Sequence, residues 1–475
     1  MPFSYPEVVS PRLRGQYARL RQLDKAIPEL QATLERLIQE RRALRREVMA
    51  YPILTLPNEL TCEIFINCLS PGRVMPTPLA PPLLLAQVCN QWRAITLALP
   101  EMWNRVRPRR LSTNTIQLLN LWLHRAGTLP ISIGLSSHYP LPHTLPSWAA
   151  LHSNKWEHVS LVLRDIELAL LATWIKVCAL KTLVIGPSER TGGPMPFVRG
   201  FKMAQNLHEV TLLRGLRPSD IDLPWAQLTT LNATGLAVPE CVDVLRSGSR
   251  LVHCTFFIHS GSVPQLPSPR LRHPHLRQLI LQYGTDHLDL LQQLELPSLT
   301  RIQLSLESGV ENVTRFLEFA AQCPHIQHMS VEAASLGPAE FIQCLRATPA
   351  VTMLEFQAPC RWETWRGLTL RSLDGHYCLP ALTQLRITDE GRWLDDTAYR
   401  TLVQMVRSRN GSSRDLNGDR PAAKLQLLSL MLLAHGRRPG VSIAKQLDDL
   451  RATTNIDICI ESRNLQLYPY PVISE

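Results

Sequence analysis

The chain has 475 residues, enough for two or three ordinary domains or for one small domain and a repeat array. Its formal net charge is +10, of which residues 1–110 contribute +7, with 16 Lys and Arg against 9 Asp and Glu. No run of about 18 apolar residues and no secretion signal is present, and the 11 cysteines form no C-x-x-C pair, so we expect no transmembrane helix, no disulfide framework and a cytoplasmic or nuclear location.

The first expected element is a helix over residues 16–50 with heptad periodicity, which is typical of a coiled coil. Apolar side chains alternate three and four residues apart at Leu20, Leu23, Ile27, Leu30, Leu34, Leu37, Leu44 and Val48. Arg41 fills the one gap, and Pro28 predicts a kink or a later start of the main helix. Two interpretations stay open: a dimerisation arm through residues 20–48, which Arg41 would weaken, or a single helix that packs on the same chain.

Residues 55–103 predict a small helical unit. An apolar stripe on a first helix comprises Leu60, Ile64, Phe65 and Leu69, and one on a second helix, about Leu83–Leu97, comprises Leu84, Val88, Trp92 and Ile95. The intervening Ser70–Pro82 contains five prolines and cannot be helical. A unit of roughly 50 residues can hardly bury both stripes by itself, so we expect a partner to cover part of them.

Both halves of this unit resemble the F-box. The first half contains L-P-x-E-L followed by I-F and L, and the second contains V-C-x-x-W-R-x-I followed by P-x-x-W. The helix that precedes it resembles the arrangement common in mushroom-forming (basidiomycete) fungi. The resemblance implies docking onto the adaptor subunit of a cullin-based (SCF-type) ubiquitin ligase. It implies that the following residues contact the adaptor or support the contact surface: Leu56, Pro57, Leu60, Ile64, Phe65, Val88 and Trp92.

From Trp156 onward the pattern L-x-x-L-x-L recurs eleven times, mostly at intervals of 21–27 residues, which is typical of a leucine-rich repeat. Amphipathic helical segments such as Val313–Ala321 lie between the patterns. We therefore predict an α/β protein with a core in the repeats that is separate from the core of the F-box. The expected parts are a coiled-coil-like helix at 16–50, an all-α F-box module at 51–104, a linker or cap at 105–150, and an irregular leucine-rich-repeat solenoid at 151–470 with a flexible loop at 409–421.

Alternation of strand side chains predicts which residues face the concave surface of the solenoid. The predicted column is Ser160, Val184, Thr211, Asn232, Thr255, Ile280, Gln303, Ser330, Glu355, Arg386 and Ser429, and the preceding column adds His158, Glu209, His253, Arg301 and His328. Neither column groups the arginines that receptors of phosphorylated motifs need. We expect phosphate-independent recognition of a protein substrate around Phe257, Ile280 and Arg301; the alternative is binding by a loop such as Gly261–Pro274.

No motif of an enzyme stands out, since a P-loop, G-x-G-x-x-G, H-E-x-x-H and G-x-S-x-G are all absent. No acidic or cysteine cluster that could complete a metal site lies beside the pairs His273/His275 and His325/His328, which indicates surface or loop histidines. We expect no catalytic residue, metal or cofactor, and no binding to membranes or nucleic acid. The predicted function is the substrate-recognition subunit of the ligase; the alternatives are a non-degradative structural interaction protein and an unrecognised hydrolase in the repeats.

Overall fold

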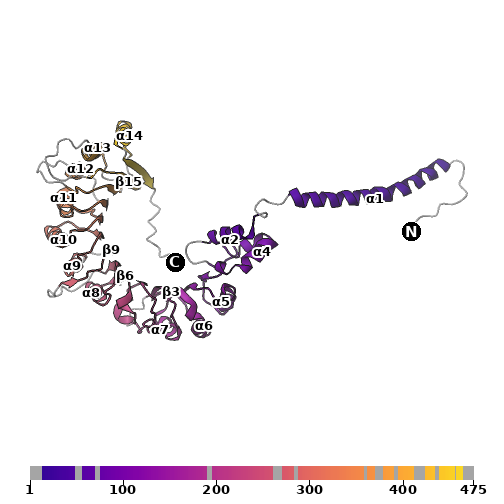
Figure 1. The fold of residues 1–475 in the computed structure, drawn as a ribbon, viewed down its shortest axis with the longest axis horizontal. Coiled ribbons are helices and arrows are strands. Elements are labelled where there is room, and N and C mark those ends of the chain that lie inside the picture. Colours follow the sequence, from indigo (N-terminus) through magenta and orange to yellow (C-terminus); the bar gives the residue numbers. More distant parts are fainter. Residues whose placement is uncertain are drawn as a thin grey trace.

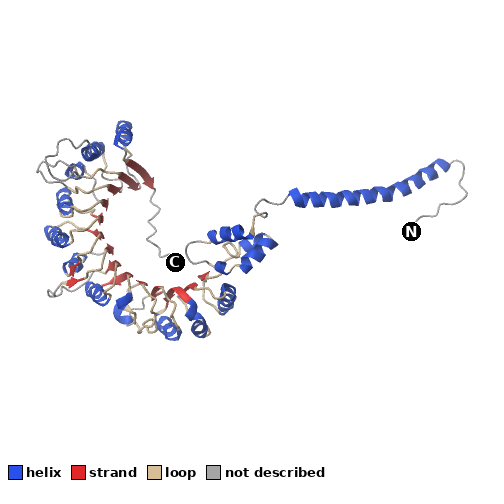
Figure 2. Ribbon diagram, in the orientation of Figure 1, coloured by secondary structure: helices blue, strands red, loops and turns tan. Residues whose placement is uncertain are grey.

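The computed structural model describes residues 13–48, 56–69, 75–189, 195–259, 270–282, 287–357, 361–369, 378–389, 394–410, 423–433, 438–454 and 456–463. Three parts follow one another along the chain: the long helix α1 (Arg14–Val48), a helical module (residues 56–103) and a curved array of repeats (Figure 1). The strands line the inner side of the curve and the helices its outer side (Figure 2). The predicted α/β class with a repeat solenoid is confirmed.

Helix α1 runs without interruption through Pro28. Its apolar stripe remains exposed: the exposed fraction lies between 41% and 67% for each of the seven apolar stripe residues from Leu20 to Leu44. No described segment of the same chain covers the stripe, so the interpretation that it packs on the rest of its own chain is wrong for the described residues.

The helical module contains α2 (Asn58–Asn67), α3 (Leu85–Val88), α4 (Asn90–Ala98) and the 3-10 turn η2 (Pro100–Met102). The prediction of one continuous second helix over Leu83–Leu97 was wrong. Cys89 adopts an extended conformation with φ −156° and ψ 171°, which separates α3 from α4. The Sγ atom of Cys89 accepts a hydrogen bond from the backbone N–H of Trp92 at 3.4 Å, which caps the restarted helix. Thr55, at the start of the expected unit, lies outside the described residues.

In the described part of the chain, fourteen strands form one sheet in which each strand pairs in parallel with its neighbours. They are β1 (Arg105–Val106), β2 (Ile131–Ser136), β3 (Trp156–Leu163), β4 (Thr182–Pro187), β5 (Glu209–Leu212), β6 (Thr230–Leu236), β7 (His253–Ile258), β9 (Gln278–Gln282), β11 (Arg301–Ser305), β12 (His328–Glu332), β13 (Met353–Gln357), β14 (Gln384–Asp389), β15 (Leu427–Leu433) and β16 (Asp457–Arg463). The short strands β8 (Leu271–Arg272) and β10 (Leu294–Glu295) pair separately. The sheet extends into the segment 105–150, which sequence analysis treats as a linker or cap.

Helical elements connect most of the strands. They are α5 (Thr113–Ala126), α6 (Leu145–His152), α7 (Asp165–Trp174), α8 (Val238–Ser247), α9 (His287–Gln292), α10 (Val310–Gln322), α11 (Pro338–Arg346), α12 (Trp362–Gly367), α13 (Asp396–Asn410) and α14 (Val441–Thr454), with 3-10 turns η3 (Ser153–Lys155), η4 (Pro218–Asp220) and η5 (Trp225–Gln227). Leu279 illustrates the packing: it is fully buried and pairs in register with Cys254 and Ile302 of the adjacent strands, so each repeat completes the core of the next.

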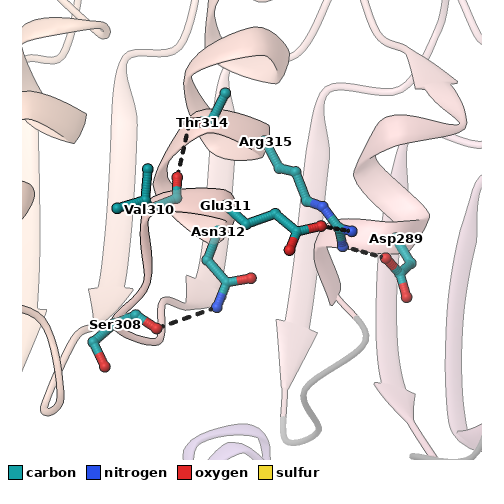
Figure 3. Close-up of polar contacts among 7 residues, drawn as sticks. All are labelled: Asp289, Ser308, Val310, Glu311, Asn312, Thr314 and Arg315. Carbon is teal, nitrogen blue, oxygen red and sulfur yellow. Dashed lines mark hydrogen bonds and ion pairs between the residues drawn. The ribbon is translucent and has the colours of Figure 1, made fainter.

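One ion-pair cluster on the outer face joins two successive repeats (Figure 3). Arg315 of α10 donates to Asp289 of α9 at 2.7 Å and also bonds Glu311 one helical turn before it. The same helix begins with local bonds, because Asn312 and Thr314 donate to the backbone carbonyls of Ser308 and Val310. These contacts tie neighbouring helices of the array together at its surface.

The start predicted for the flexible loop at 409–421 was wrong by two residues. Arg409 and Asn410 form the end of α13 and are buried, while residues 411–421 lie outside the described residues. Arg409 donates to the carbonyl oxygens of Leu368 at 2.9 Å, Leu379 at 3.1 Å and Cys378 at 2.7 Å. Burial lowers the pKa of Arg409 to about 10, so the side chain stays charged at neutral pH. A positive charge is thus held in the core by carbonyl dipoles.

Candidate protein-interaction surfaces

The seven residues singled out in the helical module fall into three environments. Phe65 is buried at 1% exposure, and its ring packs against Trp92 with centroids 4.9 Å apart and planes at 65°. Leu56 and Trp92 are half-buried, and Pro57 is exposed. Leu60, Ile64 and Val88 are exposed at 48%, 40% and 57%.

The helical geometry of α2 explains why neighbouring residues differ so much. Thr61 and Phe65 lie one turn apart and face the interior, where Thr61 Oγ1 also donates to the Pro57 carbonyl at 3.1 Å. Leu60 and Ile64 lie about 100° away around the helix and therefore form an adjacent, exposed apolar stripe. Sequence reasoning did not separate the two stripes, and it missed the exposed Ile66.

The core of the helical module continues into the first repeats, so the expected separate cores were wrong. Trp103 is fully buried and meets Trp122 of α5 edge-on, with ring centroids 4.7 Å apart and planes at 71°. Its Nε1 donates to the Thr96 carbonyl at 2.8 Å, and the Arg125 guanidinium lies 4.3 Å from the centroid of its ring. Trp103 therefore fixes the module to the end of the solenoid.

The column predicted for the concave face is one register row of the sheet. Strand pairing aligns Ser160 with Val184 and Thr211, and this alignment continues without a gap to Arg386 and Ser429. The residues of the preceding column form a second row, in which His158, Thr182 and Glu209 stand side by side. Because the helices cover only the outer face, these rows face the open inner side (Figure 2).

The three residues suggested for substrate contact lie on this inner face, on the adjacent strands β7, β9 and β11. Ile280 is half-buried between Thr255 and Gln303, and Phe257 is half-buried and pairs with Gln282. Arg301 is exposed and stands between Gln278 and His328. The structure therefore brings the three residues onto one face at three successive levels of the sheet.

Acidic residues outnumber unpaired basic ones on the described part of the inner face. Arg386 Nη1 is 3.1 Å from Glu355 Oε1 on the neighbouring strand, which neutralises its charge. The strand alternation places further carboxylates on the same face, at Glu209, Glu332, Asp457 and Glu461. The sequence analysis did not include the last three residues. Glu332 lies one row beyond the two predicted columns, and Asp457 and Glu461 lie on β16, where no repeat pattern was predicted.

In the part of the chain that the structure describes, no three His, Cys, Asp or Glu side chains lie close enough together to hold a metal ion. His273 lies in the loop after β8, which is one of the two predicted settings, but it is buried, and its Nε2 lies 3.0 Å from the Gly248 carbonyl. Burial raises the pKa of the Cys323 thiol to about 11 and that of Cys344 to about 12. The ten described cysteines are free thiols.

No protein-family model and no curated protein matches the sequence. Solved leucine-rich-repeat structures do match. The structure of the TLR13–ssRNA13 complex is 15% identical in sequence, with a TM-score of 0.35. The match covers 70% of this chain and 39% of the TLR13 chain. An internalin from Listeria monocytogenes is 11% identical in sequence, with a TM-score of 0.26. The match covers 76% of this chain and 90% of the internalin chain. This chain thus spans about two fifths of the TLR13 chain, and its repeat architecture rests on its own strand order and register.

Among the described helices, none combines the length and the apolar character that crossing a membrane requires.

Proposed function

We propose that this chain is the substrate-recognition subunit of a cullin-based (SCF-type) ubiquitin ligase, acting in the cytoplasm or nucleus. The F-box-like module would dock onto the adaptor, and the concave face of the repeats would hold a protein substrate. The observation that carries the proposal is the exposure of Leu60, Ile64 and Val88 at the positions where the F-box motif implies adaptor contact. Exposed apolar side chains of this kind gain roughly 1–2 kcal/mol each on burial in an interface.

The buried members of the motif would act indirectly. Phe65 and Trp92 pack on each other and set the orientation of α2 relative to α4, so they would support the contact surface without forming its outer face. A few anchors carry most of the binding energy in such interfaces, because association entropy offsets much of the gross apolar gain. We infer that Leu60, Ile64 and Val88 are these anchors.

Adaptor docking is tested with the full chain by replacing Leu60 and Ile64 together with Asp. The matched control replaces Leu121 and Leu170, two equally exposed leucines outside the module, with Asp. We expect the first variant to lose co-purification with the adaptor and the control to retain it, with similar thermal unfolding of both. Normal adaptor binding by the Leu60→Asp/Ile64→Asp variant would show that the proposal is wrong.

For the substrate, we propose recognition by hydrogen bonds and modest apolar contact, without phosphate. The inner face offers neutral polar rows, a paired Arg386 and several carboxylates, whereas phosphate recognition uses grouped, unpaired arginines. The test is a pull-down of captured substrate with and without phosphatase treatment. Binding that survives dephosphorylation and weakens in Phe257→Ala and Arg301→Ala supports the proposal, and loss on dephosphorylation contradicts it.

The second candidate function is a non-degradative interaction protein that uses the same two surfaces. The repeat array favours it equally, because a concave sheet binds a partner regardless of that partner's fate. The half-life of the captured protein after deletion of this chain separates the two functions: stabilisation indicates a ligase receptor. In either case we propose that the chain is not an enzyme and that it contributes proximity and orientation to chemistry performed by other subunits.

A further inference from the structure

We propose that α1 is the dimerisation arm of this protein and that it pairs with α1 of a second copy in a parallel, in-register coiled coil. This inference does not rest on adaptor docking. Its starting point is the stripe on α1, which stays exposed along a helix about 50 Å long at 1.5 Å per residue. Soluble proteins rarely leave so long a continuous apolar face in water.

The spacing of the stripe selects a coiled-coil partner. The residues at 20, 27, 34 and 41 occupy the a positions of the heptad, and those at 23, 30, 37 and 44 occupy the d positions. Every d position holds leucine, as in two-stranded parallel coiled coils. A heptad stripe on a single helix needs a partner with the same period, and a second copy of α1 supplies it. Pro28 follows an a position and lies outside the seam, so it does not enter the interface.

The charges beside the seam are complementary in the parallel orientation. In a parallel pair the g position of one helix faces the e position of the next heptad in its partner. Arg19 at g would then face Asp24 at e of the other copy, and the pair occurs twice by symmetry. Both side chains are exposed and available for this contact.

Arg41 is compatible with the parallel arrangement. In a parallel pair each Arg41 is flanked by Glu40 at the g position of the other copy, which compensates the charge in the a layer. An antiparallel pair centred on the same stripe would place Arg41 opposite Leu23 and beside Asp24 of the other copy, which compensates the same charge, so Arg41 does not select the orientation. Arg41 therefore weakens the dimer by placing a charge in the a layer.

A dimer would carry two repeat platforms on one arm. Two platforms that engage one multivalent partner raise the effective affinity without any new contact. The arm leaves both proposed binding surfaces of each copy free, because the stripe on α1 contains none of their residues.

The experiment is light scattering coupled to gel filtration on the full chain at micromolar concentrations. We expect wild type at twice the chain mass of 53.7 kDa. Leu30→Lys combined with Leu37→Lys should return the mass to that of one chain. The matched control, Ala32→Lys with Gln39→Lys, introduces the same charges on the opposite side of α1 and should stay dimeric. Circular dichroism checks that the repeats remain folded in both variants.

Two further variants test the seam itself. Arg41→Leu removes the charge from the a layer and should raise the dimer fraction at any given concentration. Arg19→Glu should lower that fraction, and adding Asp24→Arg should restore it, because the reversed pair is again complementary. Monomer for both wild type and Arg41→Leu would overturn the dimer, and a dimer indifferent to Leu30→Lys/Leu37→Lys would overturn its location. A dimer insensitive to Arg19→Glu would overturn the parallel orientation.

Discussion

Arg409 offers the sharpest test of how the last repeats hold together. The side chain is 2% exposed and donates to three backbone carbonyls, of Leu368, Cys378 and Leu379. Leu379 has a φ of 50°, in the left-handed region that a leucine rarely adopts. Arg409 therefore links α13 to two backbone segments through their carbonyl groups. The perturbation we choose is Arg409→Met, which keeps most of the volume and removes every donor.

The expected loss follows from opposing contributions. Hydrogen bonds from a charged donor contribute about 1.5–3 kcal/mol each, and their removal leaves buried carbonyls without partners. Removing a buried charge also relieves a desolvation penalty of several kcal/mol. We therefore expect Arg409→Met to lower the free energy of unfolding by about 3 kcal/mol. The free energy of unfolding of Arg409→Lys should lie between those of wild type and Arg409→Met, because a single ammonium group cannot reach all three carbonyls as the forked guanidinium does.

Urea denaturation followed by circular dichroism measures the effect, with Arg407→Met as the control on the exposed side of the same helical turn. Because repeat arrays can unfold in parts, hydrogen exchange at β14 and β15 should show the loss locally. Equal stability of the Arg409→Met and Arg407→Met variants would refute the reasoning, since it would mean that the three carbonyls find other partners.

Three other predictions concern the array and the arm. Gly200→Ala should destabilise the protein strongly, because φ is +105° and the new Cβ would lie 2.2 Å from the Ala172 carbonyl oxygen; thermal unfolding compared with Gly15→Ala, where the Cβ meets nothing within 4 Å, measures this. Arg315→Met should lower stability by no more than about 1 kcal/mol, since its ion pairs are partly exposed, and the difference from wild type should shrink in high salt; a large, salt-independent loss would contradict the surface description. Removing residues 1–50 should leave adaptor affinity unchanged in a titration, because the helical module begins beyond them, and a marked fall in affinity would assign part of the contact to α1.

The periodic features of this protein could be predicted from its amino-acid sequence. Alternation in the strands placed Ile280 and Gln303 in one row, and the heptad spacing marked the stripe on α1, because both patterns follow from local backbone geometry. Which apolar residues are covered could be known only from the folded chain, since exposure depends on neighbours far along the sequence. It buried Phe65 and exposed the adjacent Ile64, and it fused the helical module to the repeats through Trp103. Arg409 reads as part of a polar loop in sequence, yet it is buried because three carbonyls, 30 to 41 residues away, converge on its guanidinium.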